Sequence, residues 1–188
     1  MKNHPPTAEF RFKSEVTVVN LAASGRSTKT FIQEGRWDRA LKENPDVVLI
    51  QFGHNDSHDP ARPEATDAAT NYREFLRRYI DDTRSSGGIA VLITPMCRRS
   101  TPDNLGPYAD AMKAVAAEKQ VALIDLHAAS EKLYARLGTN GVVELSARLA
   151  NGQVDPTHFN ARGAQAMARL VMDELPTAAP SLKPHLKP

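Results

Sequence analysis

The sequence predicts an α/β fold built around a mostly parallel sheet. Four short apolar runs support this prediction, with segments of helical character between them. The runs cover residues 16–21, 46–52, 88–94 and 121–126. Each is nearly continuous in apolar residues rather than alternating, which indicates strands that are covered on both faces. Because strand and helix patterns alternate four times, parallel pairing through helical crossovers is expected.

The composition of the runs and the residues that end them justify the strands. The run at 16–21 is rich in valine and stops at an Ala-Ala-Ser-Gly turn. The run at 46–52 stops at Gly53, and the run at 88–94 stops at Pro95. β-branched residues favour strands, whereas glycine and proline mark the turns that end them.

Helices are predicted between and after these strands. The clearest helical pattern, at residues 66–85, begins at Thr66-Asp67 and carries Tyr72, Phe75, Leu76, Tyr79 and Ile80. The other helical segments are expected at residues 30–43, 107–119, 127–137 and 161–175. Residues 138–157 are expected to form a loop or a short helix over the site. The four prolines of residues 176–188 predict a surface tail, which leaves residues 1–175 as a single domain.

The bulk properties are those of an ordinary globular protein, with 188 residues, 41% of them apolar and 24% charged. The net charge of +2 gives no reason to expect nucleic acid or an acidic membrane as a partner. No segment approaches the ~18 consecutive apolar residues that a membrane span needs. Residues 1–6 lack the apolar core of a signal peptide, so a soluble, cytoplasmic chain is expected as written. A secreted or periplasmic location stays open if an upstream export signal has been lost.

Cys97 is the single cysteine, so no internal disulfide is expected. It follows an apolar run, which favours the role of a small buried hydrophobic residue over that of a reactive thiol. The histidines outside the motifs below lack metal-ligand spacing, and surface or packing roles are expected for them. They are His4, His58, His127 and His185. No metal and no cofactor is therefore expected.

Three polar blocks lie where the ligands of a parallel sheet usually bind, after strands or before the last helix. They are Ala23-Ser24-Gly25-Arg26-Ser27, Gly53-His54-Asn55-Asp56 and Asp155-Pro156-Thr157-His158-Phe159-Asn160. Taken singly, each has a structural reading as a turn, a loop or a helix cap. Each also has a chemical reading. A glycine N–H and an asparagine amide can stabilise an oxyanion, and an aspartate three residues before a histidine can fix the imidazole as a general base.

Together, in this order and context, the blocks resemble the SGNH (GDSL-type) hydrolases. The strings Ser-Gly-Arg-Ser, Glu34-Gly35-Arg36-Trp37, Ile50-Gln51-Phe52-Gly53-His54-Asn55-Asp56 and Thr157-His158-Phe159-Asn160 are similar to the rhamnogalacturonan acetylesterase branch. The resemblance covers residues 16–175. It implies a flavodoxin-like, three-layer α/β/α sandwich. It also implies an ester hydrolase that acts on a small-molecule or oligosaccharide ester.

The resemblance also assigns roles to individual residues. His158 would be the general base, and Asp155 its orienting partner. The Gly25 N–H and the Asn55 side chain would be oxyanion-hole donors. The remaining expected site residues, which would support the site or touch substrate, are Arg26, His54 and Asp56.

The sequence departs from the family pattern at its start. The family's nucleophilic serine stands in a Gly-Asp-Ser block at the end of a first, central strand, and the 15 residues before residue 16 contain no such block. Both the nucleophile and the first strand are therefore expected to be missing. The sheet would then need a filler, because unpaired backbone groups in a core are costly. Direct pairing of residues 16–21 with 46–52 is the preferred filler, followed by a strand from a second copy of the chain and by residues 9–13.

Two functions from different classes stay open. The first is an acetylesterase-like hydrolase of acetylated carbohydrate, in which the serine is replaced or water is activated directly by His158. The alternative is a carbohydrate-binding remnant, or an inactive truncated product, that keeps the donors without the covalent chemistry. A generic flavodoxin-like binding protein is a weaker third option, because it leaves Asp155 and His158 unexplained.

Overall fold

The computed structural model describes residues 12–99 and 102–187. It confirms the α/β class and the parallel sheet. Three strands pair in the order β1–β2–β3, where β1 is Val47–Gln51, β2 is Ile89–Ile93 and β3 is Ala122–Ile124. Both pairings are parallel, with Val47 opposite Ile89 and Leu92 opposite Leu123.

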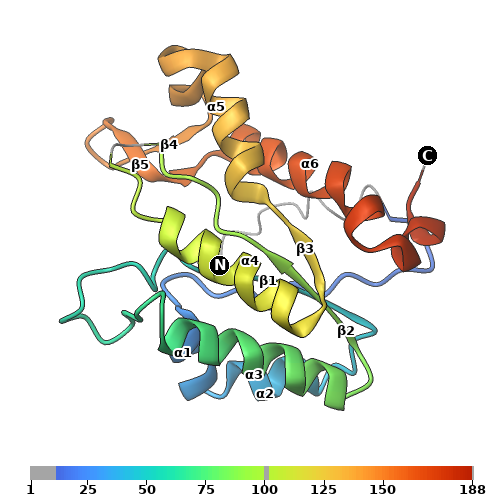
Figure 1. The fold of residues 1–188 in the computed structure, drawn as a ribbon. Helices are drawn as coiled ribbons and strands as arrows, with labels where there is room; N and C mark the ends of the chain where they lie inside the picture. The colour runs from blue at the N-terminus through green and yellow to red at the C-terminus, as the bar shows by residue number, and fades with distance from the viewer. Residues whose placement is uncertain (1–11, 100–101, 188) are drawn as a thin grey trace. The chain divides into compact units, whose positions relative to one another are not determined.

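Two long helices cover one face of this sheet. α3 (Asn71–Ser85) and α4 (Gly106–Lys119) lie side by side along it (Figure 1). The side chains that they bury recur every three or four residues along each helix, as in an amphipathic helix. They are Tyr72, Leu76, Tyr79 and Ile80 on α3 and Tyr108, Ala111, Met112 and Val115 on α4. They form one core with Ile50, Ala90 and Leu92 of the strands.

The chain divides into two compact units. One contains the three-stranded sheet and comprises residues 21–95 and 104–127. The other comprises the described parts of residues 1–20, 96–103 and 128–188. Its elements are most of α5 (Leu126–Val143), β4 (Ser146–Arg148), β5 (Val154–Phe159), α6 (Ala161–Ala178) and the 3-10 helix η2 (Pro180–His185). The single domain expected over residues 1–175 stays a prediction.

Residues 16–21 do not form the predicted strand. They have no regular secondary structure, and Val19 and Leu21 have exposed side chains. The boundary between the two units falls inside this run, between Asn20 and Leu21. An apolar run becomes a buried strand only where another strand and a covering layer meet it, and its composition supplies neither.

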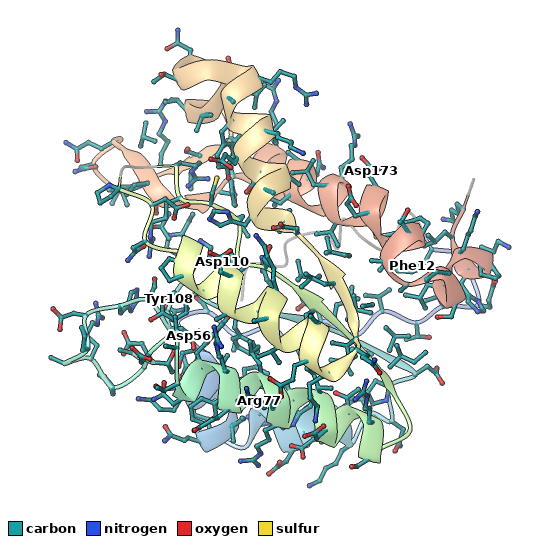
Figure 2. The ribbon with its side chains drawn as sticks, viewed as in Figure 1. Phe12, Asp56, Arg77, Tyr108, Asp110 and Asp173 are labelled. Atoms are coloured by element: carbon teal, nitrogen blue, oxygen red, sulfur yellow. The ribbon has the colours of Figure 1, made fainter. Side chains whose placement is uncertain are left out.

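The predicted pairing of residues 16–21 with residues 46–52 is therefore wrong. Among the described strands, β1 is an edge strand that pairs with β2 on one side. Most of the alternative filler, residues 9–13, lies outside the described residues. Of that filler, Phe12 is described, and it forms an antiparallel bridge with Leu186 rather than with β1. Figure 2 shows Phe12 beside the C-terminal segment.

The predicted helix at residues 30–43 is two short helices, α1 (Thr28–Gln33) and α2 (Arg36–Leu41). Gly35 separates them with a left-handed backbone, at φ 66°. The predicted helix at 66–85 begins only at Asn71. Asp67 explains the delay, because its carboxylate accepts hydrogen bonds from the backbone N–H groups of Ala69 and Thr70 and so holds a turn.

Residues 138–157, predicted to form a loop or a short helix over the site, contain more structure than expected. α5 continues to Val143 across a break at Gly138, and β4 and β5 then form an antiparallel hairpin. The last helix, α6, continues past Pro176 to Ala178. Residues Pro180–His185, in the predicted surface tail, form a 3-10 helix.

Candidate active site

The loop after β1 begins at Gly53, where the backbone needs a glycine. Its φ is +133°, and a Cβ atom there would lie 2.8 Å from Cγ of Pro95. No other residue fits this conformation and this close contact without strain. The Gly53 N–H points into the loop and donates to Oδ2 of Asp56 at 3.1 Å.

Asp56 is fully buried and holds this loop to two other segments. Its carboxylate accepts from the N–H of Thr28 at 3.1 Å, from Oγ1 of Thr28 at 2.5 Å and from Oγ1 of Thr66 at 3.0 Å. The Tyr108 hydroxyl oxygen lies 2.5 Å from the backbone oxygen of Thr66 and 3.0 Å from that of Asp56. Figure 2 shows Tyr108 and Asp56 next to one another. Burial raises the pKa of the Asp56 carboxyl, and the hydrogen bonds from Thr28, Thr66 and Gly53 oppose that rise. Of the two roles expected for Asp56, this geometry favours support over contact with substrate.

Asn55 links the same loop to the turn that carries Gly25. Its side-chain Nδ2 donates to the backbone oxygen of Arg26 at 3.1 Å. Gly25 is exposed with φ +77°, and a Cβ atom there would meet nothing within 4 Å, so the backbone conformation favours glycine at this position. The sheet-bearing unit therefore brings together two of the expected oxyanion donors, Gly25 and Asn55, within one hydrogen-bonded pair of loops.

Arg26 and Ser27 have structural partners. Nε of Arg26 lies 3.0 Å from both carboxylate oxygens of Glu34, and Nη1 donates to the backbone oxygen of Ser24 at 2.8 Å. Ser27 is buried and caps α1 in a reciprocal pair of hydrogen bonds with Thr30. His54 is half-buried, and its backbone oxygen accepts from the Ser57 hydroxyl at 3.0 Å.

Asp155 and His158 lie on β5, in the other compact unit. Nδ1 of His158 is 2.9 Å from Oδ2 of Asp155. The second carboxylate oxygen, Oδ1, accepts from the backbone N–H groups of Thr157 and His158, both at 2.8 Å. The contact expected from their spacing is therefore present.

These hydrogen bonds keep the Asp155 carboxyl ionised. The N–H groups of His158 and Thr157, followed by the imidazole, lower the pKa of Asp155 to about 2. The carboxylate is thus ionised at neutral pH and can only accept, which assigns the hydrogen between the two side chains to Nδ1. The Asp155 side chain is 13% exposed, whereas that of His158 is 70% exposed. The imidazole of His158 is thus largely open to solvent.

The sequence did not reveal the role of Arg99. Its Nη2 donates to the backbone oxygens of His158 at 2.9 Å and Asp155 at 3.2 Å. Its guanidinium lies 4.1 Å from the centre of the Phe159 ring. No local motif could have identified it, because Arg99 is more than 50 residues away from these partners in the chain.

The remaining candidates have plainer surroundings. Cys97 is buried, and burial raises the pKa of its thiol, which argues against a reactive thiolate. Across residues 12–99 and 102–187, no three His, Cys, Asp or Glu side chains form a group that could hold a metal ion. No helix in that part of the chain combines the length and the apolar character needed to cross a membrane.

Comparison with known proteins identifies relatives. Residues 7–166 match the GDSL-like Lipase/Acylhydrolase family. Rhamnogalacturonan acetylesterase RhgT of Bacillus subtilis (strain 168) is 36% identical over 196 residues, covering 93% of this chain and 81% of RhgT. The probable rhamnogalacturonan acetylesterase YesY of the same organism is 36% identical over 167 residues, covering 83% of this chain and 75% of YesY.

Two solved structures have a similar fold. The crystal structure of YxiM from Bacillus subtilis superposes with a TM-score of 0.76 and 26% identity over 91% of this chain, which spans 48% of the YxiM chain. An acetyl xylan esterase, AlAXEase, has a TM-score of 0.64 and 20% identity over 81% of this chain and 78% of its own, and supports the fold alone. The family match and the two acetylesterase relatives lead to one conclusion: this chain belongs to the GDSL-like lipase/acylhydrolase family.

Proposed function

We propose that this chain is a carboxylic ester hydrolase that removes acetyl groups from a carbohydrate. Its family membership supports ester hydrolysis in general. The names of RhgT and YesY, both rhamnogalacturonan acetylesterases, support an acetylated oligosaccharide or polysaccharide as the substrate class. A small acyl ester would then serve as a minimal substrate.

The contact of 2.9 Å between His158 Nδ1 and Asp155 Oδ2 carries the proposal. With Nδ1 held by the carboxylate, Nε2 of His158 takes the proton from the attacking hydroxyl or water as its oxygen bonds to the acetyl carbon. The same nitrogen returns the proton to the sugar oxygen as the ester bond breaks. When water attacks, this step gives acetate and a free hydroxyl group on the carbohydrate. When a protein hydroxyl attacks, the sugar leaves first and the acetyl group stays on the protein as an ester, which a water molecule activated by the same nitrogen then hydrolyses to acetate.

The proposed oxyanion donors are the Gly25 N–H and the Asn55 side chain. The Asn55 amide carries two hydrogens, and one of them is used on the backbone oxygen of Arg26. The hydrogen bond also fixes the direction of the amide before substrate arrives. Preorganised donors of this kind each contribute about 3 kcal/mol to transition-state stabilisation in well-studied hydrolases.

A nucleophile has to come from outside a Gly-Asp-Ser string, because the given sequence contains none. Ser27 is an unsuitable replacement, since it is buried and its hydroxyl caps α1. Ser24 is exposed beside Gly25 and is the better candidate of the two. Water activated by His158 is the simpler route, with a rate far below that of a serine hydrolase.

A second candidate function is a carbohydrate-binding protein without turnover. Such a protein would bind an acetylated oligosaccharide and leave its esters intact. Calorimetric binding measured beside acetate release separates this candidate from the enzyme.

The test is acetate release from 4-nitrophenyl acetate and from acetylated rhamnogalacturonan. We expect a slow rate that falls to the background level in His158→Ala, because the substitution removes the proposed base. Extending the chain at its N-terminus by a strand that ends in Gly-Asp-Ser should raise the rate on the order of 10³-fold or more, because it supplies the covalent route.

His185→Ala is the matched control, since it removes an exposed histidine of η2 and should leave the rate unchanged. Ser24→Ala tests the improvised nucleophile separately. A rate that is indifferent to His158→Ala in both the original and the extended chain would overturn the proposed site.

A further inference from the structure

Arg99 lies where a side chain can control the shape of the segment that carries Asp155 and His158. It is in the same compact unit as that segment. The backbone oxygens of Asp155 and His158 both accept from its Nη2, at 3.2 and 2.9 Å. One nitrogen therefore joins the two ends of the four-residue segment.

The same guanidinium also fixes the residue that follows. Its carbon Cζ lies 4.1 Å from the centre of the Phe159 ring, within the range of a cation–π contact. The ring and the two carbonyl groups thus hold Arg99 from different sides. A planar guanidinium can satisfy both at once, whereas an ammonium group can donate to a carbonyl but cannot stack in this way.

The buried position of Arg99 is energetically unfavourable for part of its guanidinium group. Nε and Nη1 of Arg99 are buried and have no hydrogen-bond partner among the residues that the structure describes. Burial also lowers the pKa of the guanidinium. Burying donors of a cation without partners is unfavourable, so a charge kept there points to a role that a neutral side chain does not fill.

We propose that Arg99 is a positioning residue that clamps the backbone of residues 155–158, so that the Asp155 carboxylate keeps its hydrogen bonds to the His158 N–H and imidazole. The clamp acts on the carbonyl side of the segment, and the carboxylate binds the N–H groups on the other side. The effect of the clamp on catalysis rests on the proposed esterase function. The geometry of the clamp can be tested without turnover.

The test is the titration of the Asp155 carboxyl, followed by ¹³C NMR. Among the described residues, the charged groups that contact Asp155 are His158 and Arg99. In the parent chain the pKa of Asp155 should be about 2, because the N–H groups of His158 and Thr157 hold the carboxylate. Arg99→Met removes the clamp, so this pKa should rise toward the ordinary aspartate value of 3.8.

Arg99→Lys separates positioning from charge, because lysine keeps the cation and loses the planar fork. We expect the pKa of Asp155 to rise in Arg99→Lys nearly as far as in Arg99→Met. Full retention of the parent value by lysine would show that charge alone matters and would overturn the clamp. An unchanged titration in both variants would overturn it as well.

Arg162→Met is the control, because it removes an exposed arginine of the same unit that pairs with Glu144. It should leave the titration of Asp155 as in the parent. Circular dichroism checks that each variant is folded, and if Arg99→Met fails this check the lysine variant carries the test.

Where esterase turnover is measurable, Arg99→Lys should lower kcat at least tenfold with KM within twofold. If the pKa of Asp155 responds as expected but the chain has no esterase turnover, the proposed esterase function is wrong and the proposed clamp stands.

Discussion

At the scale of single residues, Asp56 is the group on which the loops of the sheet-bearing unit converge. Its side chain accepts from Thr28, Gly53 and Thr66, residues that are up to 28 positions away. Asn55 is its direct neighbour in the chain, so the position of the proposed oxyanion donor depends on this buried carboxylate. Buried networks of this kind are rigid when every member has a partner.

Asp56→Asn should destabilise the fold measurably. The amide replaces one acceptor oxygen by an NH₂ group, which then faces an N–H or hydroxyl donor. An unsatisfied buried donor costs about 1–3 kcal/mol in the free energy of unfolding. For a domain of this size, each kcal/mol lowers Tm by about 2–4 °C. Differential scanning calorimetry of the parent and the variant measures the change.

Asp38→Asn provides the comparison, because Asp38 is exposed on α2. Its Tm should stay within about 2 °C of the parent, as expected for a surface substitution. Equal Tm values for the Asp56 and Asp38 variants would show that the buried hydrogen bonds around Asp56 contribute nothing measurable to stability.

The residues of the candidate site could be predicted only in part. Short motifs located Gly25, Asn55, Asp155 and His158. The spacing of the last two predicted their contact, because they are only three positions apart in the chain. Residues that act through distant partners were missed. Arg99 and Tyr108 reach their partners across more than 40 residues, and no local pattern encodes such contacts.

At the scale of elements, the hairpin of β4 and β5 is joined closely to the start of α6. Asn160 caps α6 by accepting from the Gly163 N–H at 2.9 Å, and its Nδ2 donates to the backbone oxygen of Ser146 at 3.0 Å. A Cβ atom on Gly163 would collide with the backbone oxygen of Leu145 and lie 2.5 Å from Cδ1 of Phe159. The strand that carries His158 therefore packs against the first turn of α6 through a glycine.

Gly163→Ala should destabilise the chain, although alanine is the better helix former. The added methyl group forces apart backbone atoms that cannot rotate away, and overpacking of this kind costs about 1–3 kcal/mol. Urea unfolding followed by circular dichroism measures the loss. The backbone N–H resonances of Phe159 and Asn160 should also shift, because the methyl group presses on this segment.

Gly106→Ala is the matched control on another helix. A Cβ atom at Gly106, the first residue of α4, would meet nothing within 4 Å. That substitution should change the free energy of unfolding by less than about 1 kcal/mol, in either direction. If Gly163→Ala proved as mild as Gly106→Ala, the proposed close packing of β5 on α6 would be wrong.

The elements themselves were predicted where local periodicity determines them. Three of the four expected strands formed, as did all the expected helices, although residues 30–43 formed two helices and residues 66–85 began late. Gly35 and Asp67 caused those two differences through turn chemistry inside an apolar pattern. The hairpin of β4 and β5 was missed because its strands are short and polar, and their pairing is not visible in composition.

At the scale of the whole molecule, β1 is one of the two edge strands of the three-stranded sheet in the described part of the chain. Among the described strands, β1 pairs on one side with β2, and its Leu49 side chain is 40% exposed. Ile89 on the neighbouring strand is exposed as well. Exposed edges with apolar side chains favour pairing with another chain, which natural proteins usually prevent with charged residues.

We therefore expect the chain to self-associate through β1 as its concentration rises. Leu49→Lys places a charge on the edge strand, which should repel a second copy and shift the population toward monomer, without altering the buried face that contains Ile50. Sedimentation velocity at several concentrations measures the distribution of species. Leu137→Lys is the control, because Leu137 has a similar exposure of 37% but lies on helix α5, where no strand edge is available. Association through β1 requires that Leu49→Lys weaken it and that Leu137→Lys leave it intact. A parent chain that stays monomeric at every concentration, or two variants that behave alike, would show that the β1 edge does not recruit a second copy.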